Sequence, residues 1–100
     1  MTFIVLFEDN PDADPAIRST HMAEHLDFLE AHASQISAAG PLTGLDHTAA
    51  GGLWIVEGAD ATAVQGLVEA DPFWPTGLRQ KVTILHWRQV FADGKRQSAR

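Results

Sequence analysis

The chain of 100 residues contains no cysteine. This absence excludes disulfide bonds, zinc sites made of thiolates and cysteine nucleophiles. Apolar residues make up 45% of the chain and charged residues 20%, which is the composition of a globular protein. A chain of this length forms one small domain, and a second subunit would help to bury its apolar surface.

Basic residues are scarce. Lysine and arginine together number 7, against 13 aspartates and glutamates, so the formal net charge is −6. An acidic surface repels phosphate backbones, and nucleic acid is therefore not expected as a partner. Residues 92–100 differ, because Lys95, Arg96 and Arg100 outnumber Asp93. We expect a flexible basic tail there, after a domain formed by residues 1–91.

Long apolar runs are also absent. The run near the start of the chain ends at Phe7, and no basic segment precedes it. It is too short for a signal peptide or a membrane span. We expect no membrane partner and a cytoplasmic location.

Segments of strand and helix character alternate along the chain. Strand composition recurs over residues 2–8, 42–48, 53–58 and 81–91. Helical spacing of apolar residues is found over residues 15–38 and 61–70. The order β-α-β-β-α-β predicts an α+β, ferredoxin-like fold, with both helices on one face of an antiparallel sheet. Residues 49–52 are predicted to form a turn, and the two prolines of residues 71–78 a break.

The predicted first helix has recognisable ends. Asp14 is expected as its N-cap before Pro15, and Gly40 as its C-cap before Pro41. Its apolar stripe is expected to face the core: Met22, Leu26, Leu29, Ala33 and Ile36. Asp60 is expected to cap the second helix in the same way.

The predicted strands are apolar on both faces. In the first strand, Phe3 and Val5 point to one face and Ile4 and Leu6 to the other. Helices cover only one face of such a sheet, and soluble monomers rarely expose an apolar patch of that size. The sequence therefore predicts a homodimer in which the two sheets pack face to face.

Residues 21–25 read HMAEH, the H-x-x-E-H string of one class of zinc peptidases. His21 and His25 would share one helical face, but a zinc site needs a third ligand, and no downstream motif supplies it. We expect no metal. Four side chains form one edge of this helix: Arg18, His21, His25 and His32. Two interpretations stay open, a stripe that lines a pocket and the solvated border of an amphipathic helix.

Three segments together resemble the YCII-related domain family: EHLDFLEAHASQISAAGPL (24–42), ADPFWPTGL (70–78) and KVTILHW (81–87). The resemblance implies a ferredoxin-like dimer related to the dimeric α+β barrels. Some relatives remove chloride from chlorinated aromatic breakdown products or isomerise lactones, without a cofactor. It also implies that His25 and Asp71 are an acid–base pair. The arginine and proline that usually precede this histidine are replaced by Met22 and Ala23, which puts an anion contact in doubt.

Asp71 also has a purely structural interpretation. An aspartate before Pro72 is a good N-cap for a short helical turn, and the two roles are compatible. The neighbouring Phe73 and Trp74, with Trp54 and Trp87, are suited to an apolar wall and equally to core or dimer packing. The expected ligand-binding residues are Phe73, Trp74, Gly40 and Pro41.

Two functions follow from these residues. The first is a small enzyme that moves protons without a cofactor, using His25 and Asp71 on a small, partly apolar acid or aromatic breakdown product. The second is a dimer that binds a small ligand without catalysis. The sequence identifies no substrate.

Overall fold

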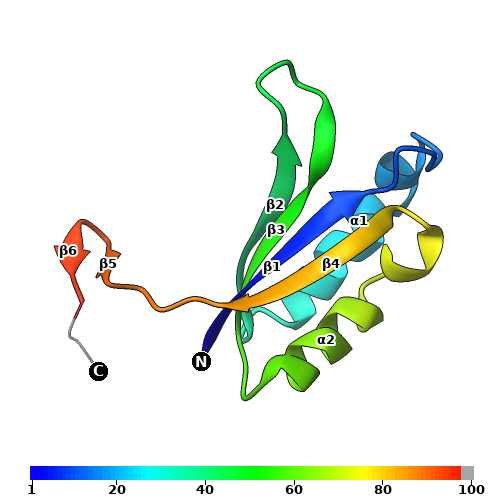
Figure 1. The fold of residues 1–100 in the computed structure, drawn as a ribbon. Helices are drawn as coiled ribbons and strands as arrows, with labels where there is room; N and C mark the ends of the chain where they lie inside the picture. Colours follow the sequence, from blue (N-terminus) through cyan, green and yellow to red (C-terminus); the bar gives the residue numbers. More distant parts are fainter. Residues whose placement is uncertain (98–100) are drawn as a thin grey trace.

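The computed structural model describes residues 1–97. Four strands form one antiparallel sheet in the order β2-β3-β1-β4: β1 (Thr2–Asp9), β2 (Ile36–Thr43), β3 (Ala49–Glu57) and β4 (Arg79–His86). Two helices, α1 (Ile17–Ala31) and α2 (Ala61–Ala70), cover one face of this sheet (Figure 1). The predicted α+β, ferredoxin-like fold is confirmed. No helix within residues 1–97 is long and apolar enough to cross a membrane.

The core lies between the sheet and the helices. Strand β1 is central and pairs with β3 on one side and β4 on the other. Its alternate residues Phe3, Val5 and Phe7 point toward the helices and are buried. Residues from the neighbouring elements complete this core: Ile36, Trp54, Val56, Val64, Leu67 and Val68. Helix α2 begins as predicted, because the Asp60 carboxylate accepts a hydrogen bond of 2.8 Å from the amide of Ala63.

The predicted extent of the first helix was wrong at both ends. Helix α1 begins at Ile17 without a side-chain cap, because the Asp14 carboxylate accepts from the amide of Ala16 in the preceding turn. It ends at Ala31, and β2 begins five residues later. Gly40 and Pro41 are therefore strand residues and cap no helix. Proline is tolerated there because β2 is an edge strand of the sheet.

The predicted apolar stripe of α1 was right in part. Leu29 packs against the core, and Ile36 is buried in it at the start of β2. Leu26 is 49% exposed, whereas His25 is the buried residue of this helix. The side of α1 that meets the sheet also contains His21 and Phe28. His25, in the middle of the helix edge that also carries Arg18, His21 and His32, is buried and is therefore not part of a solvated border.

Residues 49–52 form the start of β3 and not the predicted turn. Gly51 and Gly52 lie opposite Glu8 and Phe7 of β1. A Cβ atom at Gly51 would lie 1.8 Å from the carbonyl oxygen of Phe7, so the close approach of the two backbones requires glycine. The turn comes earlier, between β2 and β3.

The end of the chain forms a small hairpin in place of a plain tail. Strand β4 ends at His86, and β5 (Phe91–Ala92) pairs with β6 (Lys95–Arg96). This hairpin lies apart from the sheet and the helices (Figure 1). Its flexibility stays a prediction, and the last part of the predicted tail, residues 98–100, lies outside the described residues.

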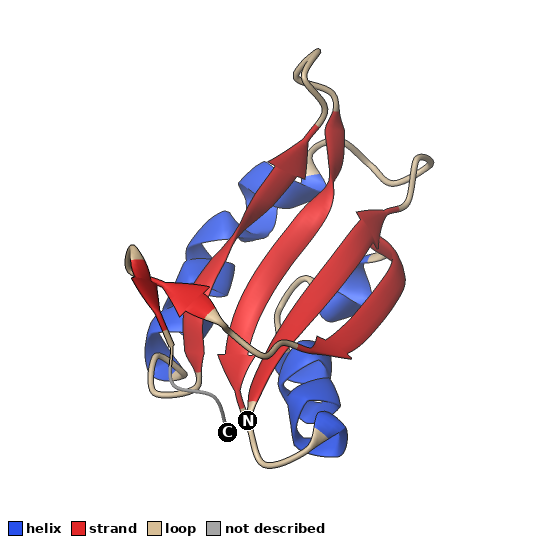
Figure 2. Cartoon of the chain, turned by 60° about the vertical axis from the view of Figure 1, so that its left-hand side comes forward, coloured by secondary structure: helices blue, strands red, loops and turns tan. Residues whose placement is uncertain are grey.

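The face of the sheet opposite the helices is apolar and open. Ile4 lies between Ile55 and Leu85, and Leu6 lies beside Leu53. These side chains alternate with the buried ones of the same strands, and Leu85 is 48% exposed. Figure 2 shows the sheet with both helices behind it. We propose that a second copy of the chain covers this face.

A charge on this face should dissociate the proposed dimer. We expect the wild-type protein to have twice the monomer mass of 10.9 kDa by light scattering at micromolar concentration. Ile55→Glu should give a folded monomer, because a carboxylate between apolar strands is costly to desolvate. Thr62→Glu, at an exposed position of α2, is the matched control and should stay dimeric. A monomeric wild-type protein would remove the proposal.

Candidate active site

His25 and Asp71 meet between the two helices. The Nδ1 atom of His25 lies 2.8 Å from the Oδ1 atom of Asp71. His25 comes from the middle of α1, and Asp71 ends α2 as its C-cap residue. Both helices cover the same face of the sheet, so the end of one reaches the side of the other. The two residues are 8% and 3% exposed, so both are buried.

Backbone amides of the turn that follows α2 hold Asp71 in place. Its Oδ1 atom also accepts a hydrogen bond of 3.3 Å from the amide of Phe73, and its carbonyl oxygen accepts one of 2.8 Å from the amide of Trp74. These bonds form the turn that precedes the short 3-10 helix η1 (Trp74–Thr76), whose N-cap residue is Phe73 and not the predicted Asp71. The carboxylate therefore caps a turn and meets the histidine with the same oxygen, so the cap-only interpretation of Asp71 is incomplete.

Aromatic rings surround the imidazole of His25. The centroid of Phe73 lies 4.5 Å from that of His25, and Trp54 is stacked at 6.4 Å. The hydrogen bonds among residues 1–97 engage Nδ1 and leave Nε2 without a partner. Nε2 is also not among the fully buried nitrogen atoms that lack a partner, so it retains contact with solvent. One ring nitrogen is thus held by Asp71, while the other has no hydrogen-bond partner within residues 1–97.

A second polar cluster lies at the N-terminal end of α1. Asp9, at the end of β1, accepts two hydrogen bonds from Arg18, of 2.6 and 3.3 Å. Arg18 also donates a bond of 3.2 Å to the carbonyl oxygen of Gly51. Arg79 lies opposite Asp9 across the β1–β4 pairing, and its Nη1 atom is 3.7 Å from Asp9. One carboxylate thus faces two guanidinium groups.

The guanidinium of Arg79 is buried among aromatic rings. Its Cζ atom lies 4.1 Å from the ring centroid of Phe7 and 5.5 Å from that of Phe73. Burial lowers the pKa of Arg79 from its ordinary value. The negative charge of Asp71 opposes this change, Arg18 adds to it, and Asp9 opposes it. Asp71 therefore acts electrostatically on Arg79 while its oxygen is bonded to His25.

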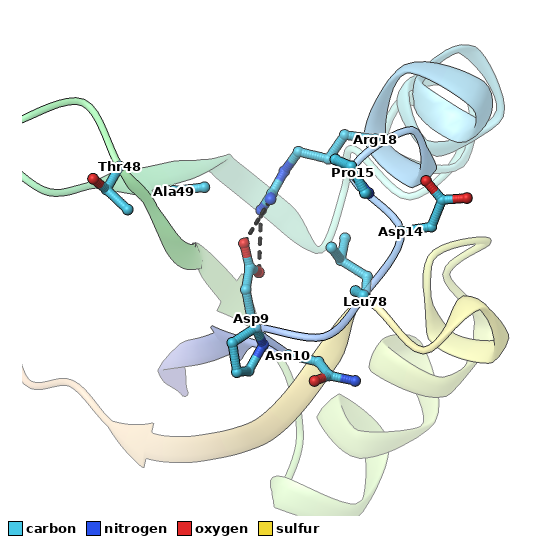
Figure 3. A pocket seen from close by; sticks show the side chains of 10 residues that line it. Asp9, Asn10, Asp14, Pro15, Arg18, Thr48, Ala49 and Leu78 are labelled. Carbon is cyan, nitrogen blue, oxygen red and sulfur yellow. Dashed lines mark hydrogen bonds and ion pairs between the residues drawn. The ribbon is translucent and has the colours of Figure 1, made fainter.

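A cavity of about 460 Å³ opens beside Arg18. Its lining includes Asp9, Asn10, Pro15, Thr48 and Leu78 (Figure 3). His25 and Asp71 do not line it. The cavity lies at the end of α1 where that helix begins. Leu78, which lines it, directly precedes Arg79.

The zinc string does not form a metal site in this geometry. Glu24 is exposed while His25 is buried, so the glutamate points away from the neighbouring histidine. Asp71 already occupies Nδ1 of His25. Within residues 1–97, no three His, Asp or Glu side chains gather closely enough to hold a metal ion. The absence of a metal stays a prediction.

The other expected ligand-binding residues are scattered. Phe73 is buried against His25, whereas Trp74 is exposed on η1. Gly40 and Pro41 are exposed on β2, away from the buried pair. Their contact with a ligand stays a prediction. Sequence reasoning missed Asp9 and Arg79, because nothing along the chain indicated that the start of β4 would lie opposite the end of β1.

Comparison with known proteins identifies the family of this chain. The model of the YCII-related domain family matches residues 1–88. The chain belongs to the YCII-related domain family. Among proteins of curated function, none matches this YCII-related chain.

Three solved structures resemble this YCII-related domain. The 5-chloro-2-hydroxyhydroquinone dehydrochlorinase TftG from Burkholderia phenoliruptrix AC1100, in complex with 2,5-dihydroxybenzoquinone, is 28% identical with a TM-score of 0.74. The match covers 88% of this chain and 94% of that one. Rv0793 from Mycobacterium tuberculosis is 16% identical, with the same two coverages and a TM-score of 0.49. At3g17210 from Arabidopsis thaliana is 12% identical, with coverages of 92% and 97% and a TM-score of 0.47.

Asp9 should matter for stability, because it is the carboxylate nearest to two buried or half-buried cations. Asp9→Ala should lower the free energy of unfolding by about 3 kcal/mol, as expected when one partner of a buried ion pair is removed. Urea denaturation measures this loss. The control Asp27→Ala, at an exposed position of α1, should change the free energy by less than about 0.5 kcal/mol. Equal effects of the two substitutions would contradict the assignment.

Proposed function

We propose that this protein is a small enzyme of acid–base chemistry that works without a cofactor. It removes chloride from, or isomerises, a small hydroxylated ring or a partly apolar acid. His25 is the base and acid, and Asp71 orients it. The observation that carries the proposal is the buried hydrogen bond of 2.8 Å between these side chains, in a wall of aromatic rings.

The likeness to the dehydrochlorinase supports the substrate class. That protein is 28% identical over most of both chains, and its structure holds 2,5-dihydroxybenzoquinone. A planar hydroxylated ring suits an environment made of Phe73 and Trp54, because flat rings pack well against aromatic side chains. The catalytic step needs no metal or redox group, since loss of HCl changes only protons and one carbon–chlorine bond.

The geometry divides the work between the two ring nitrogens. Nδ1–H of His25 donates to the Asp71 carboxylate, which leaves the lone pair of Nε2 free. Nε2 takes a proton from a hydroxyl of the ring and delivers it to the carbon that bears chlorine, which becomes tetrahedral. Removal of a second proton, from a hydroxyl conjugated with that carbon, then forms a carbonyl group and a new carbon–carbon double bond, and chloride leaves with the electrons of the broken carbon–chlorine bond. The imidazolium that forms is held beside a carboxylate, which offsets its charge. In an isomerisation, Nε2 returns the proton to another carbon atom.

A ligand-binding protein without catalysis is the second candidate. It is favoured by the position of the cavity, which has a volume of about 460 Å³ and is lined by Asp9 and Arg18 but by neither His25 nor Asp71. A ligand confined to that cavity would meet no proton-transfer group.

Chloride release from 5-chloro-2-hydroxyhydroquinone, followed with a chloride-selective electrode, tests the first candidate. His25→Gln and Asp71→Asn should each lower kcat/KM by about 10²- to 10⁴-fold, as is typical for a proton-transfer group. The double variant should lose little more than either single one, because the two residues act as a unit.

His32→Gln is the matched control, since this histidine follows the same helix but contacts only Phe28 among the aromatic rings of residues 1–97. It should keep its activity. If the wild-type protein binds the compound and releases no chloride, the second candidate is correct. Full activity in either variant of the pair would exclude the proposed roles.

A further inference from the structure

Arg79 is a buried cation whose hydrogen-bonding capacity is largely unused. Its side chain is 6% exposed. Neither its Nε nor its Nη1 atom has a hydrogen-bond partner, and both are inaccessible to solvent. Leaving charged donors unpaired in the interior is costly, so a residue in this state requires an explanation.

The neighbouring carboxylates do not supply the missing partner. Asp9 directs both oxygens to Arg18, and its contact with Arg79 at 3.7 Å is too long for a hydrogen bond. Asp71 directs Oδ1 to His25 and to the amide of Phe73. Asp71 and Asp9 both act on Arg79 through their negative charge, but neither supplies a hydrogen bond to its Nε or Nη1 atom.

This unpaired guanidinium lies next to the proposed proton-transfer residues. The ring of Phe73 is 4.5 Å from the ring of His25 and 5.5 Å from Cζ of Arg79, so one aromatic side chain contacts both. Space for the guanidinium exists because residue 52 is glycine: a Cβ atom there would lie 3.2 Å from Nη1. His21, one turn before His25 on α1, adds a buried Nδ1 atom that also lacks a partner.

We propose that Arg79 binds the ionised oxygen of the substrate, either a carboxylate or a deprotonated ring hydroxyl, beside the His25–Asp71 pair. The substrate is then an anion with a planar oxyanion group, and a neutral ring of the same size is a poor ligand. Arginine suits this task because its charge is permanent and its N–H groups are directional. The inference rests on the proposed function for the identity of the reacting residues, but anion binding by Arg79 can be measured without catalysis.

Two probes separate charge from shape in calorimetric titrations at neutral pH. The first is 2,5-dihydroxybenzoquinone, whose hydroxyl groups are conjugated to carbonyl groups and ionise readily. The second is hydroquinone, whose phenolic hydroxyls stay protonated. Arg79→Gln should weaken binding of the anionic probe by about 10- to 100-fold, the worth of a hydrogen bond to a charged group. It should change binding of hydroquinone by less than about 2-fold, an effect well below one such bond.

Lys81→Gln is the matched control, because Lys81 is an exposed cation of the same strand. It should bind both probes as the wild type does. Arg79→Lys should recover part of the lost affinity, since it keeps the charge and loses the fixed geometry. If Arg79→Gln binds the anionic probe as tightly as the wild type, or if the wild type does not prefer the anion, the inference is wrong. Loss of chloride release in His25→Gln would then still support the proposed function.

Stability without ligand gives a second readout. A cation kept for a ligand is a cost to the empty protein, so Arg79→Met should leave the Tm unchanged or raise it. If Arg79 instead stabilised the core through its contacts with Asp9 and Phe7, its replacement would lower the Tm. A decrease in Tm of about 4 °C or more, roughly 1 kcal/mol for a domain of this size, would contradict the proposal.

Discussion

The hydrogen bond between His25 and Asp71 is the contact on which the organisation of the helical layer depends. It joins the middle of α1 to the end of α2 at 2.8 Å, in surroundings that exclude most water. A buried polar group without a partner is costly, so either side chain alone would destabilise the layer. The same Asp71 oxygen also accepts a hydrogen bond from the amide of Phe73, in the turn that follows α2 and leads toward β4.

Much of the fold could be predicted from local patterns. The strands around Phe3 and Trp54 and the cap at Asp60 depend on neighbouring residues alone, and they lie where the sequence places them. The first helix was predicted too long because Gly40 and Pro41 resemble a helix end, whereas pairing with β3 makes them part of an edge strand. Tertiary contacts overrode the local signal there, as they commonly do.

The candidate site, like the fold, could be predicted only in part from the sequence. Resemblance to a family pointed to His25 and Asp71, and the fold brings their side chains together. The apolar stripe expected on α1 included Leu26, which is exposed, and did not include His25, which is buried. The face of this helix that meets the sheet carries histidines where leucines would be usual. Asp9 and Arg79 were missed for a different reason. They are 70 residues apart, and only the register between β1 and β4 makes them neighbours.

The proposed role of His25 depends on which of its ring nitrogens carries the proton when the ring is neutral. Nitrogen-resolved NMR of the histidine side chains, recorded on the wild type and on Asp71→Asn at a pH where imidazole is neutral, measures this directly. Wild-type His25 should be protonated at Nδ1, with a bare Nε2, and this preference should weaken in the variant. A wild-type His25 protonated at Nε2, or one that exchanges freely between both forms, would contradict the proposed role.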